Sequence, residues 1–539
     1  MFDEYPRPQM ARKEWLNLCG SWEYAITSSP AAPAAWDGTI LVPFSPEAPL
    51  SGVGRTLQPG EYLWYRRTAE FPGEGGRVLI HFGAVDQIAS VRMNGREMGS
   101  HYGGYTPFTV DVTDALHGDG TDVLTVVVRD DSDASSLAHG KQMRERGGIW
   151  YTPQSGIWQP VWAERVPETY IRSLRITPRY DDAAVEIDAV PGGTVRFAGR
   201  EYPCPAVVPV PDFEPWTPEH PKLYDFSVVL GEDEVQSYFA MRKFSVEAER
   251  LCLNGKPYFH NGVLDQGYCP DGLMTYPSDE AMLRDIETAK AMGFNTIRKH
   301  MKVEPLRWYW HCDRLGMLVW QDMPAGGGPF SPALIHTPLF VDLRMRDDRY
   351  RVFGRTDVLG RKRFLDEMED MIRALYNCPC IAVWSPFNEG WGQFDSRKAA
   401  ARIDELDGTR TVEAASGWYD QGGGELNSRH VYYHKYKFVP DPSGRATVLS
   451  EFGGYNLRIQ HHAWNDREFG YDRCRSKGEL ENKLRTLYRK QIAPAKEAGL
   501  AAAIYTQLTD IEDELNGLVT YDRQVLKILP ETMKKIVSV

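Results

Sequence analysis

The hydrophobic pattern of the chain changes near residue 250, and this change limits the folds that the chain can adopt. Before that point, short runs of alternating polar and apolar residues are separated by turn residues, as in RVLIHF at 77–82 and DVLTVVVRD at 122–130. Alternation with a period of two and frequent turns predicts antiparallel β-sandwiches. After that point, short apolar strands alternate with amphipathic helical stretches, which predicts parallel βα units.

We expect three domains, because one hydrophobic core rarely supports a chain of 539 residues. Residues 1–165 predict an N-terminal β-sandwich. Residues 166–248 have sparser strands, with a proline-rich stretch at 203–221, and predict an immunoglobulin-like β-sandwich that serves as a spacer. Residues 249–539 predict a C-terminal TIM (β/α)8 barrel.

Eight apolar segments are the candidate strands of this barrel. They are 257–264, 295–300, 317–322, 381–388, 411–416, 430–435, 447–453 and 501–507. Between the first two, Ser278 predicts the start of a helix that runs to Met292 and is ended by Gly293. A longer helical insertion is expected at about 331–377.

Reactive residues of a TIM barrel lie where the strands end and the βα loops begin. At these positions the chain has carboxylates, cations, amides and aromatic rings, which together would suit a polyol-binding pocket. They are His260, Asp265, Arg298, His300, Gln321, Asp322, Asn388, Glu389, Trp418, His434, Tyr436, Glu451 and Gln507. Any one of them alone would be ordinary as a surface or capping residue.

Two of these carboxylates form a candidate catalytic pair. Glu389 follows the fourth strand and Glu451 follows the start of the seventh. Strands four and seven lie across a closed eight-stranded barrel, so the two side chains should face each other. A glycosidase needs one carboxyl group as acid/base and a second on the opposite side of the bond. The alternative for each residue is a glutamate at a helix N-terminus, stabilised by the helix dipole.

Composition excludes some classes of function. The formal net charge is −12 and no stripe rich in Lys and Arg appears, which argues against a nucleic-acid-binding protein. The 15 Trp and 27 Tyr exceed what cores need. They fit an aromatic-rich β portion and surfaces that stack on sugar rings equally well. No apolar stretch is long enough to span a bilayer, so we expect no membrane association.

The cysteines and the first residues bear on the compartment. The eight cysteines are scattered without the spacing of a metal site, and MFDEYPRP lacks the basic and apolar regions of a secretory signal. We therefore expect free thiols and a cytoplasmic protein.

The order of several sequence blocks resembles that of glycoside hydrolase family 2, which contains β-galactosidases, β-glucuronidases and β-mannosidases. Residues 82–116 resemble its sugar-binding jelly-roll domain, and SGIWQPVW at 155–162 resembles the segment that closes that domain. Residues 295–322 resemble its second and third barrel strands. NCPCIAVWSPFNEG at 377–390 resembles the acid/base signature, and SEFGGY at 450–455 resembles the nucleophile segment. The resemblance covers nearly the whole chain.

The resemblance implies a retaining exo-β-glycosidase in which Glu389 is the general acid/base and Glu451 the nucleophile, about 5–5.5 Å apart. Asn388 would bind the sugar 2-hydroxyl, and Arg298 would hold Glu451 ionised. Tyr436 would donate a hydrogen bond to Glu451 from the sixth strand. Among the other candidates, Trp384 and Trp391 would form an apolar wall beside Glu389. The substrate would be contacted by Asp265, His434 and Gln507. For His300, Asp322 and Trp418, contact with the substrate and support of residues that contact it are both expected.

The implied chemistry requires a carbohydrate substrate and no cofactor. No metal is expected either, because the Glu-x-His ligands of large β-galactosidases are missing after 320–322. The Asn-x-Lys clamp of the β-glucuronidases is missing after strand eight, and LDQGYCPDG at 264–272 replaces the His-Glu-rich loop of the galactosidases. The sugar is therefore left open, with a β-galactoside as the first expectation.

Two alternatives to a hydrolase stay open. A carbohydrate-binding protein without catalytic activity would keep the aromatic residues, although retention of both carboxylates and Asn388 argues against it. A transglycosylase would share the first half of the reaction and differ only in the acceptor. The sequence also leaves open whether the protein forms a homo-oligomer.

Overall fold

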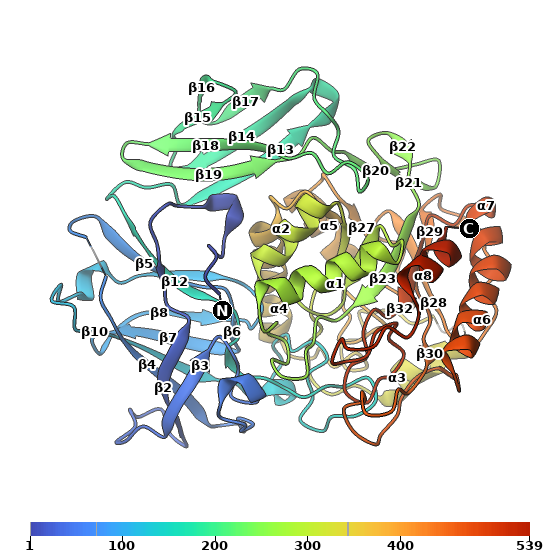
Figure 1. Cartoon of the computed structure of the whole chain (residues 1–539), viewed down its shortest axis with the longest axis horizontal. Helices are drawn as coiled ribbons and strands as arrows, with labels where there is room; N and C mark the ends of the chain where they lie inside the picture. The colour runs from blue at the N-terminus through green and yellow to red at the C-terminus, as the bar shows by residue number, and fades with distance from the viewer. Residues whose placement is uncertain (1, 72, 342–343, 539) are drawn as a thin grey trace.

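A computed structural model describes residues 2–71, 73–341 and 344–538 of the chain. Figure 1 shows two β-sandwiches packed beside a C-terminal barrel, with the first sandwich at the left and the second at the top. The expected fold class, two β-sandwiches followed by a TIM barrel, is confirmed.

The first sandwich has two antiparallel sheets and a short ladder. The larger sheet has the order β3 (Gly38–Val42), β2 (Gly20–Thr27), β4 (Tyr62–Ala69), β10 (Asp122–Arg129), β7 (Ile88–Met93) and β8 (Arg96–Tyr102). The smaller sheet has the order β1 (Leu16–Asn17), β12 (Val161–Val166), β5 (Arg77–Phe82) and β9 (Phe108–Asp111), and β11 (Gly156–Ile157) pairs with β6 (Val85–Asp86). Alternate residues such as Trp22, Leu63 and Val126 point inward and fill one core, as the period-two pattern predicts.

The second sandwich is smaller and has its own core. One sheet consists of β13 (Ser173–Arg179), β14 (Ala184–Val190) and β17 (Ala206–Pro209), and the other of β16 (Arg200–Pro203), β15 (Thr194–Phe197), β18 (Tyr224–Leu230) and β19 (Asp233–Phe239). Ile187, Val208 and Phe226 lie in the core between them. A small antiparallel sheet of β20 (Phe244–Glu247), β21 (Arg250–Leu253) and β22 (Lys256–Pro257) leads into the barrel.

The barrel is a parallel sheet of eight strands. Along the chain they are β23 (His260–Asp265), β24 (Thr296–Lys299), β25 (Leu318–Asp322), β26 (Ile381–Ser385), β27 (Thr411–Val412), β28 (Leu426–Val431), β29 (Ala446–Gly453) and β32 (Ala502–Thr506). The ladder is continuous from β27 through β23 to β28. Glu425 N donates to Val412 O at 3.0 Å and helps to close the ring between β27 and β28. The sixth strand therefore lies four residues earlier than the predicted 430–435.

Helices cover the outside of the barrel. They are α1 (Asp279–Ala291), α2 (Leu306–Leu315), α4 (Val358–Leu375), α5 (Ser396–Leu406), α6 (Lys477–Leu487), α7 (Ala493–Ala498) and α8 (Pro530–Val537). The Ser278 side chain accepts a hydrogen bond from Ala281 N and so caps α1, as predicted. The expected insertion at 331–377 is only partly helical. It has a short α3 (Pro332–His336), a 3-10 turn at Thr337–Leu339 and then α4, while residues 342–343 lie outside the described part.

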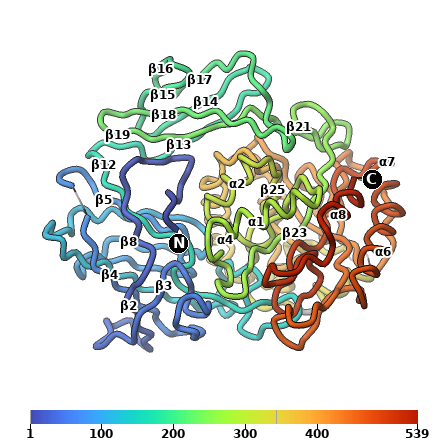
Figure 2. The backbone as a smooth tube through the Cα atoms, viewed as in Figure 1, coloured from blue at the N-terminus to red at the C-terminus, as the bar shows by residue number. Residues whose placement is uncertain are grey.

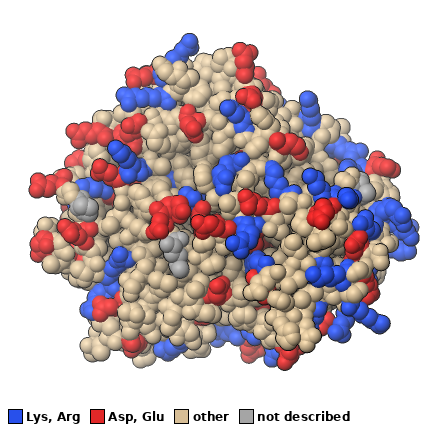
Figure 3. All heavy atoms as spheres, in the orientation of Figure 1, with Lys and Arg blue, Asp and Glu red and all other residues tan. Residues whose placement is uncertain are grey.

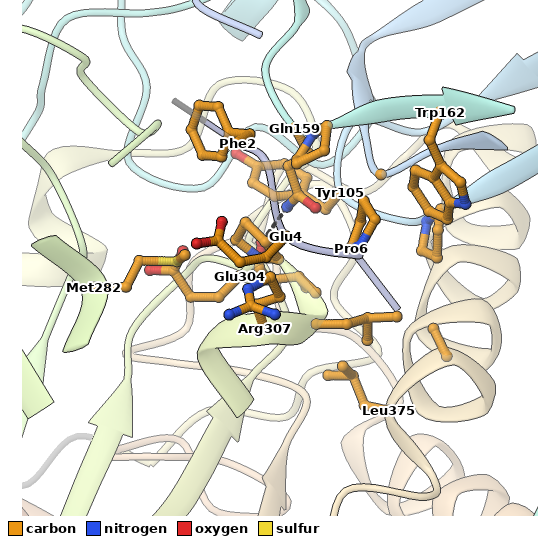
Figure 4. A pocket seen from close by; sticks show the side chains of 17 residues that line it. Phe2, Glu4, Pro6, Tyr105, Gln159, Trp162, Met282, Glu304, Arg307 and Leu375 are labelled. Atoms are coloured by element: carbon orange, nitrogen blue, oxygen red, sulfur yellow. Dashed lines mark hydrogen bonds between the residues drawn. The ribbon is translucent and has the colours of Figure 1, made fainter. Parts of the chain in front are cut away.

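The N-terminal segment lies in the seam between the first sandwich and the barrel (Figure 2). Figure 4 shows a pocket in this seam, to which the segment contributes Phe2, Glu4 and Pro6. The sandwich contributes Tyr105, Gln159 and Trp162, and the barrel domain contributes Met282, Glu304, Arg307 and Leu375. The sandwich and the barrel are thus held together by the chain start as well as by direct contacts.

On the surface, acidic and basic side chains are interspersed over the face drawn in Figure 3. Mixed charge of this kind does not resemble the continuous basic face of a nucleic-acid-binding protein. Among the described helices, none is long and apolar enough to cross a membrane.

Candidate active site

The two carboxylates of the predicted pair lie at the carboxyl ends of β26 and β29, which are three strands apart in the closed barrel. Glu389 follows β26 in a left-handed backbone conformation with φ of 51°, and Glu389 N donates to Ser416 O at 2.9 Å. Glu451 lies within β29. Glu389 is only 6% exposed and Glu451 only 5%, so water hardly reaches either carboxylate.

His430, at the end of β28, joins the two glutamates. One oxygen of each carboxylate and one ring nitrogen of His430 all lie within 4.8 Å of one another. His430 Nδ1 is 2.7 Å from Glu389 Oε1, and His430 Nε2 is 3.6 Å from Glu451 Oε1. The oxygens of the pair are therefore close together across the barrel mouth.

Glu451 is surrounded by groups that favour its ionised form. Arg298 NH1 lies 3.1 Å from Oε1, and the Tyr432 hydroxyl donates to Oε2. Burial would raise the pKa of Glu451, but the charges of His430 and Arg298 and the Tyr432 hydrogen bond lower it to about 2. Glu451 is thus a carboxylate at any pH at which the protein would work.

Glu389 has the opposite environment. Burial raises its pKa above the ordinary value, and the nearby Glu451 charge raises it further, while the hydrogen bond with His430 acts against both. The Trp418 indole donates to the backbone oxygen of Glu389 at 3.0 Å and fixes this turn. The two glutamates therefore differ in the direction of their pKa shift although they lie side by side.

A network of buried polar side chains lies next to the two carboxylates. Arg298 contacts Asp322 through Nε at 3.1 Å and Asn388 Oδ1 through NH2 at 2.9 Å. His300 Nδ1 lies 2.6 Å from Asp322 Oδ2, and burial lowers the pKa of His300 well below its ordinary value. The structure thus brings Arg298, His300, Asp322 and Asn388 to the carboxylate pair, as the sequence predicted.

Of the predicted tryptophans, Trp391 and Trp418 lie at the barrel mouth and Trp384 does not. The Trp391 ring packs edge-on against His300, with 6.1 Å between centroids. The Trp384 indole instead donates to Asp407, at the end of α5, at 2.9 Å. Trp384 therefore points outward between the strand and its helix, and it is no wall of the pocket.

Gln507, after the last strand, belongs to a chain of amides. Its Oε1 accepts from Gln266 Nε2 at 2.7 Å and its Nε2 donates to Asn516 at 2.8 Å. Gln266 Nε2 also reaches the Tyr151 hydroxyl at 2.8 Å. Gln507 thus connects the barrel to a loop of the first sandwich.

Three predicted residues do not reach the pair. The slip of the sixth strand places Tyr432, not Tyr436, beside Glu451. The Tyr436 hydroxyl is buried and has no hydrogen-bond partner in the described part of the chain, and His434 is exposed. Asp265 forms an ion pair at 2.6 Å with Lys299, whose ammonium group lies 4.3 Å from the Trp308 ring of α2. Asp265 therefore serves a buried ion pair beneath α2.

A loop of the first sandwich closes one side of the mouth. His139 N donates to Ala325 O at 2.8 Å, which anchors this loop to the segment after β25. The Lys141 ammonium group then lies 5.5 Å from the Trp391 ring and 5.4 Å from the Tyr151 ring. No carboxylate of the described residues forms an ion pair with Lys141, although its charge lowers the pKa of Glu389 against the effect of burial.

Three residues at the site were not predicted from the sequence, namely His430, Tyr432 and Lys141. A strand placed at 426–431 would have pointed to the first two, because His430 then lies at the strand end and Tyr432 follows on the same side. Lys141 had no such signal, since no pattern within the sandwich tells which of its loops reaches the barrel.

Within the described part of the chain, Glu389, His430 and Glu451 are also the group of acidic, His and Cys side chains close enough to share a metal ion. Both ring nitrogens of His430 already have partners, Glu389 at Nδ1 and the Ser416 hydroxyl at 2.9 Å from Nε2. A metal ligand needs a free lone pair on the ring. The contacts thus fit a hydrogen-bonded carboxylate pair better than a metal centre, and the expected lack of a metal stays a prediction.

Comparison with known proteins points to one family. Residues 244–491 match the family model for the TIM barrel domain of glycosyl hydrolases family 2, and residues 57–166 match that for the galactose-binding domain-like part of glycosyl hydrolase 2. Together these two regions cover more than half of the chain.

Curated relatives and solved structures agree with this. A β-galactosidase of Thermoanaerobacter pseudethanolicus is 25% identical over 389 residues, 64% of this chain and 47% of the relative. A putative β-glucuronidase of Formosa agariphila is 25% identical over 360 residues, 60% of this chain and 39% of the relative. The chain thus spans less than half the length of these two relatives. A β-D-glucuronidase of Dictyoglomus thermophilum has the same fold, with a TM-score of 0.77 at 16% identity, over 99% of this chain and 98% of that one. A β-galacturonidase of Eisenbergiella tayi has a TM-score of 0.74 at 19% identity, over 99% of both chains.

Proposed function

Because the chain belongs to glycoside hydrolase family 2, we propose that it is a retaining exo-β-glycosidase that works by double displacement. In this proposal Glu451 is the nucleophile and Glu389 the general acid/base. The substrate is a carbohydrate with a terminal β-linked sugar.

The observation that carries the proposal is the close pair of carboxylates with opposite pKa shifts. Carboxyl groups about 5–5.5 Å apart are typical of retaining enzymes, whereas inverting enzymes leave about 6.5–9.5 Å for a water molecule. Oxygens of Glu389 and Glu451 within 4.8 Å of each other match the retaining class. The lowered pKa of Glu451 suits a nucleophile, and the raised pKa of Glu389 suits a proton donor.

The reaction would proceed in two displacement steps, which the residues around the two glutamates assist. Glu451 attacks the anomeric carbon while Glu389 protonates the leaving oxygen, which gives a covalent glycosyl-enzyme. Glu389 then takes a proton from water as the water oxygen attacks the anomeric carbon, which breaks the bond to Glu451 and releases the sugar with its configuration retained. Asn388 Nδ2 is buried without a hydrogen-bond partner among the described residues, so it is free to donate to the sugar 2-hydroxyl. Arg298 and Tyr432 hold Glu451 in line for attack.

The closed side of the barrel mouth supports action on chain ends. The loop that carries Lys141 and Tyr151 fills that side, and the Tyr151 hydroxyl donates to Glu514 of the loop after β32. A pocket blocked in this way would admit one terminal sugar and would exclude the interior of a polymer.

A cytoplasmic location is part of the proposal. All eight cysteines are free thiols, as is usual for proteins kept in a reducing compartment. Fractionation of the cells that produce the protein would test this location.

The test of the activity is a panel of aryl β-glycosides with galactose, glucose, glucuronic acid, mannose, xylose and arabinose as the sugar, beginning with the galactoside. We expect release of the coloured leaving group from at least one member, and its loss in Glu451→Ala. If no member is cleaved, the protein is no exo-β-glycosidase of this class, and binding of the free sugars would then test the carbohydrate-binding alternative.

A further inference from the structure

A column of aromatic rings runs from the nucleophile to the surface. Tyr432, which donates to Glu451, stacks on Tyr471 with 3.6 Å between centroids and 6° between planes. Tyr433 packs edge-on against Tyr471 at 5.7 Å, and Phe340 stacks on Tyr433 at 5.4 Å and 18°. The column thus links the floor of the active site to two rings at its rim.

The two outer rings are unusually exposed. Phe340 is 62% exposed and Tyr433 is 46% exposed, although both are large apolar side chains. They come from segments far apart in the chain, one after the 3-10 turn Thr337–Leu339 and one after β28. Two separate segments that converge to hold stacked rings in water indicate a binding surface, because isolated exposed rings need no such support.

The rim rings lie on the acid/base side of the mouth. The segment that leads to Phe340 packs through Leu334 and Leu339 into a cluster with Trp418 and Tyr419. Trp418 donates to the backbone of Glu389, the residue that would protonate the leaving oxygen. The loop with Lys141 instead closes the mouth beside Trp391 and the loop after β32. The leaving group should therefore emerge toward Phe340 and Tyr433.

We propose that Phe340 and Tyr433 form a platform on which the leaving group stacks, and that this leaving group is a sugar ring, so that the substrate is an oligosaccharide. The C–H groups on one face of a pyranose are weakly electropositive and pack well on the electron-rich face of an aromatic ring. An apolar platform next to a polar, buried catalytic pair suits a ligand with one apolar face and polar edges. This inference rests on the proposed glycosidase function.

The test compares two substrates that share the sugar selected by the aryl panel. One is its β-glycosyl fluoride, whose leaving group is too small to touch the platform. The other is its best-cleaved disaccharide with glucose, chosen from the β-1,3, β-1,4 and β-1,6 linkages. The variants are Phe340→Ala, Tyr433→Ala and the double variant. Tyr433→Phe keeps the ring, and Tyr102→Ala removes a similarly exposed ring, 49% exposed, on β8 of the first sandwich.

We expect kcat/KM for the disaccharide to fall about fivefold to tenfold for each ring removed. The value for the fluoride should not change, and Tyr433→Phe and Tyr102→Ala should match the unaltered protein with both substrates. Equal losses on the two substrates would mean that the rings only support the fold, and would overturn the inference. Cleavage of the fluoride but of none of the disaccharides would also overturn it while leaving the glycosidase function intact.

A last outcome concerns a second copy of the chain. If the double variant changes the oligomeric state in sedimentation experiments, and the disaccharide is cleaved as before, the two rings form a subunit contact and the proposal is wrong. If the unaltered protein cleaves neither the fluoride nor any aryl glycoside, the proposed function fails first.

Discussion

The ends of strands β26 and β29 carry the same residue type, equally buried, with opposite acid–base properties. Glu451 is held between Arg298 and Tyr432, and its pKa falls to about 2. Glu389 is paired with His430 instead, and burial together with the charge of Glu451 raises its pKa. The neighbours, and not the depth of burial, therefore set the opposite pKa shifts of the two glutamates.

His430 lies between the two glutamates and is close to both of them. Its Nδ1 faces Glu389 and its Nε2 faces Ser416, with Glu451 slightly farther away. One buried ring thus sets the distance between the carboxylates.

Replacement of the Glu389 carboxyl group by an amide should have a larger effect than removal of any neighbouring side chain. In Glu389→Gln, kcat for substrates with poor leaving groups should fall by about 10²- to 10⁴-fold, the usual contribution of a general acid. For good leaving groups the loss should be smaller, and the basic limb of the pH–rate profile should vanish. Rates measured from pH 4 to pH 10 check this, and an unchanged basic limb would show that another group is the acid.

Removal of the hydroxyl beside Glu451 should have the next largest effect. Tyr432→Phe deletes a hydrogen bond to an ionised group, and we expect kcat/KM to fall by about tenfold or more. Because that bond lowers the pKa of Glu451, the acidic limb should move to higher pH. Tyr436→Phe is the matched control and should leave both quantities unchanged, because the Tyr436 hydroxyl has no hydrogen-bond partner. Equal effects of the two variants would contradict the placement of Tyr432.

A smaller effect is expected at His430. His430→Ala removes the hydrogen bond that lowers the pKa of Glu389, so the basic limb should move to higher pH. The rate should fall by about tenfold because Glu389 is no longer held in place. His430→Asn restores a donor near the position of Nδ1 and should recover part of the rate. If the basic limb stays where it was, His430 does not act on Glu389.

No effect is expected from chelation. Incubation with EDTA followed by dialysis should leave the rate nearly unaltered, because His430 keeps both ring nitrogens in hydrogen bonds. A large loss of activity that Mg²⁺ or Zn²⁺ restores would mean that Glu389, His430 and Glu451 hold a metal ion. The reaction would then depend on that metal and not on the two carboxylates alone.

The closeness of the two carboxylates could be predicted because both glutamates follow strongly apolar strands. IAVW before Glu389 and TVL before Glu451 mark the strand positions clearly, and the barrel then brings the strand ends together. The same criterion, an apolar run, places the sixth strand too late in the sequence. Its residues Leu426–Val431 include the polar Ser428 and His430, which face the polar barrel mouth, so a search for apolar runs selects the later VYY.

Contacts between domains could not be predicted from the sequence. Lys141 comes from a sandwich loop, and its place above Trp391 depends on how that loop docks on Ala325. The outward direction of Trp384 also follows from packing, since its indole meets Asp407 behind the strand. Local pattern thus predicts which strand end carries a residue, and tertiary packing decides which side of the strand it faces.

The most direct test of the account uses Glu451→Ala with azide. The variant should lose turnover of aryl glycosides, because no covalent intermediate can form, and azide should restore part of it from the vacated space. The glycosyl azide formed should have inverted anomeric configuration, which NMR spectroscopy determines. Glu389→Ala should also be rescued, but through the covalent intermediate and with retained configuration. Near-normal turnover of Glu451→Ala without azide, or a retained azide product from it, would contradict the assignment of Glu451 as the nucleophile.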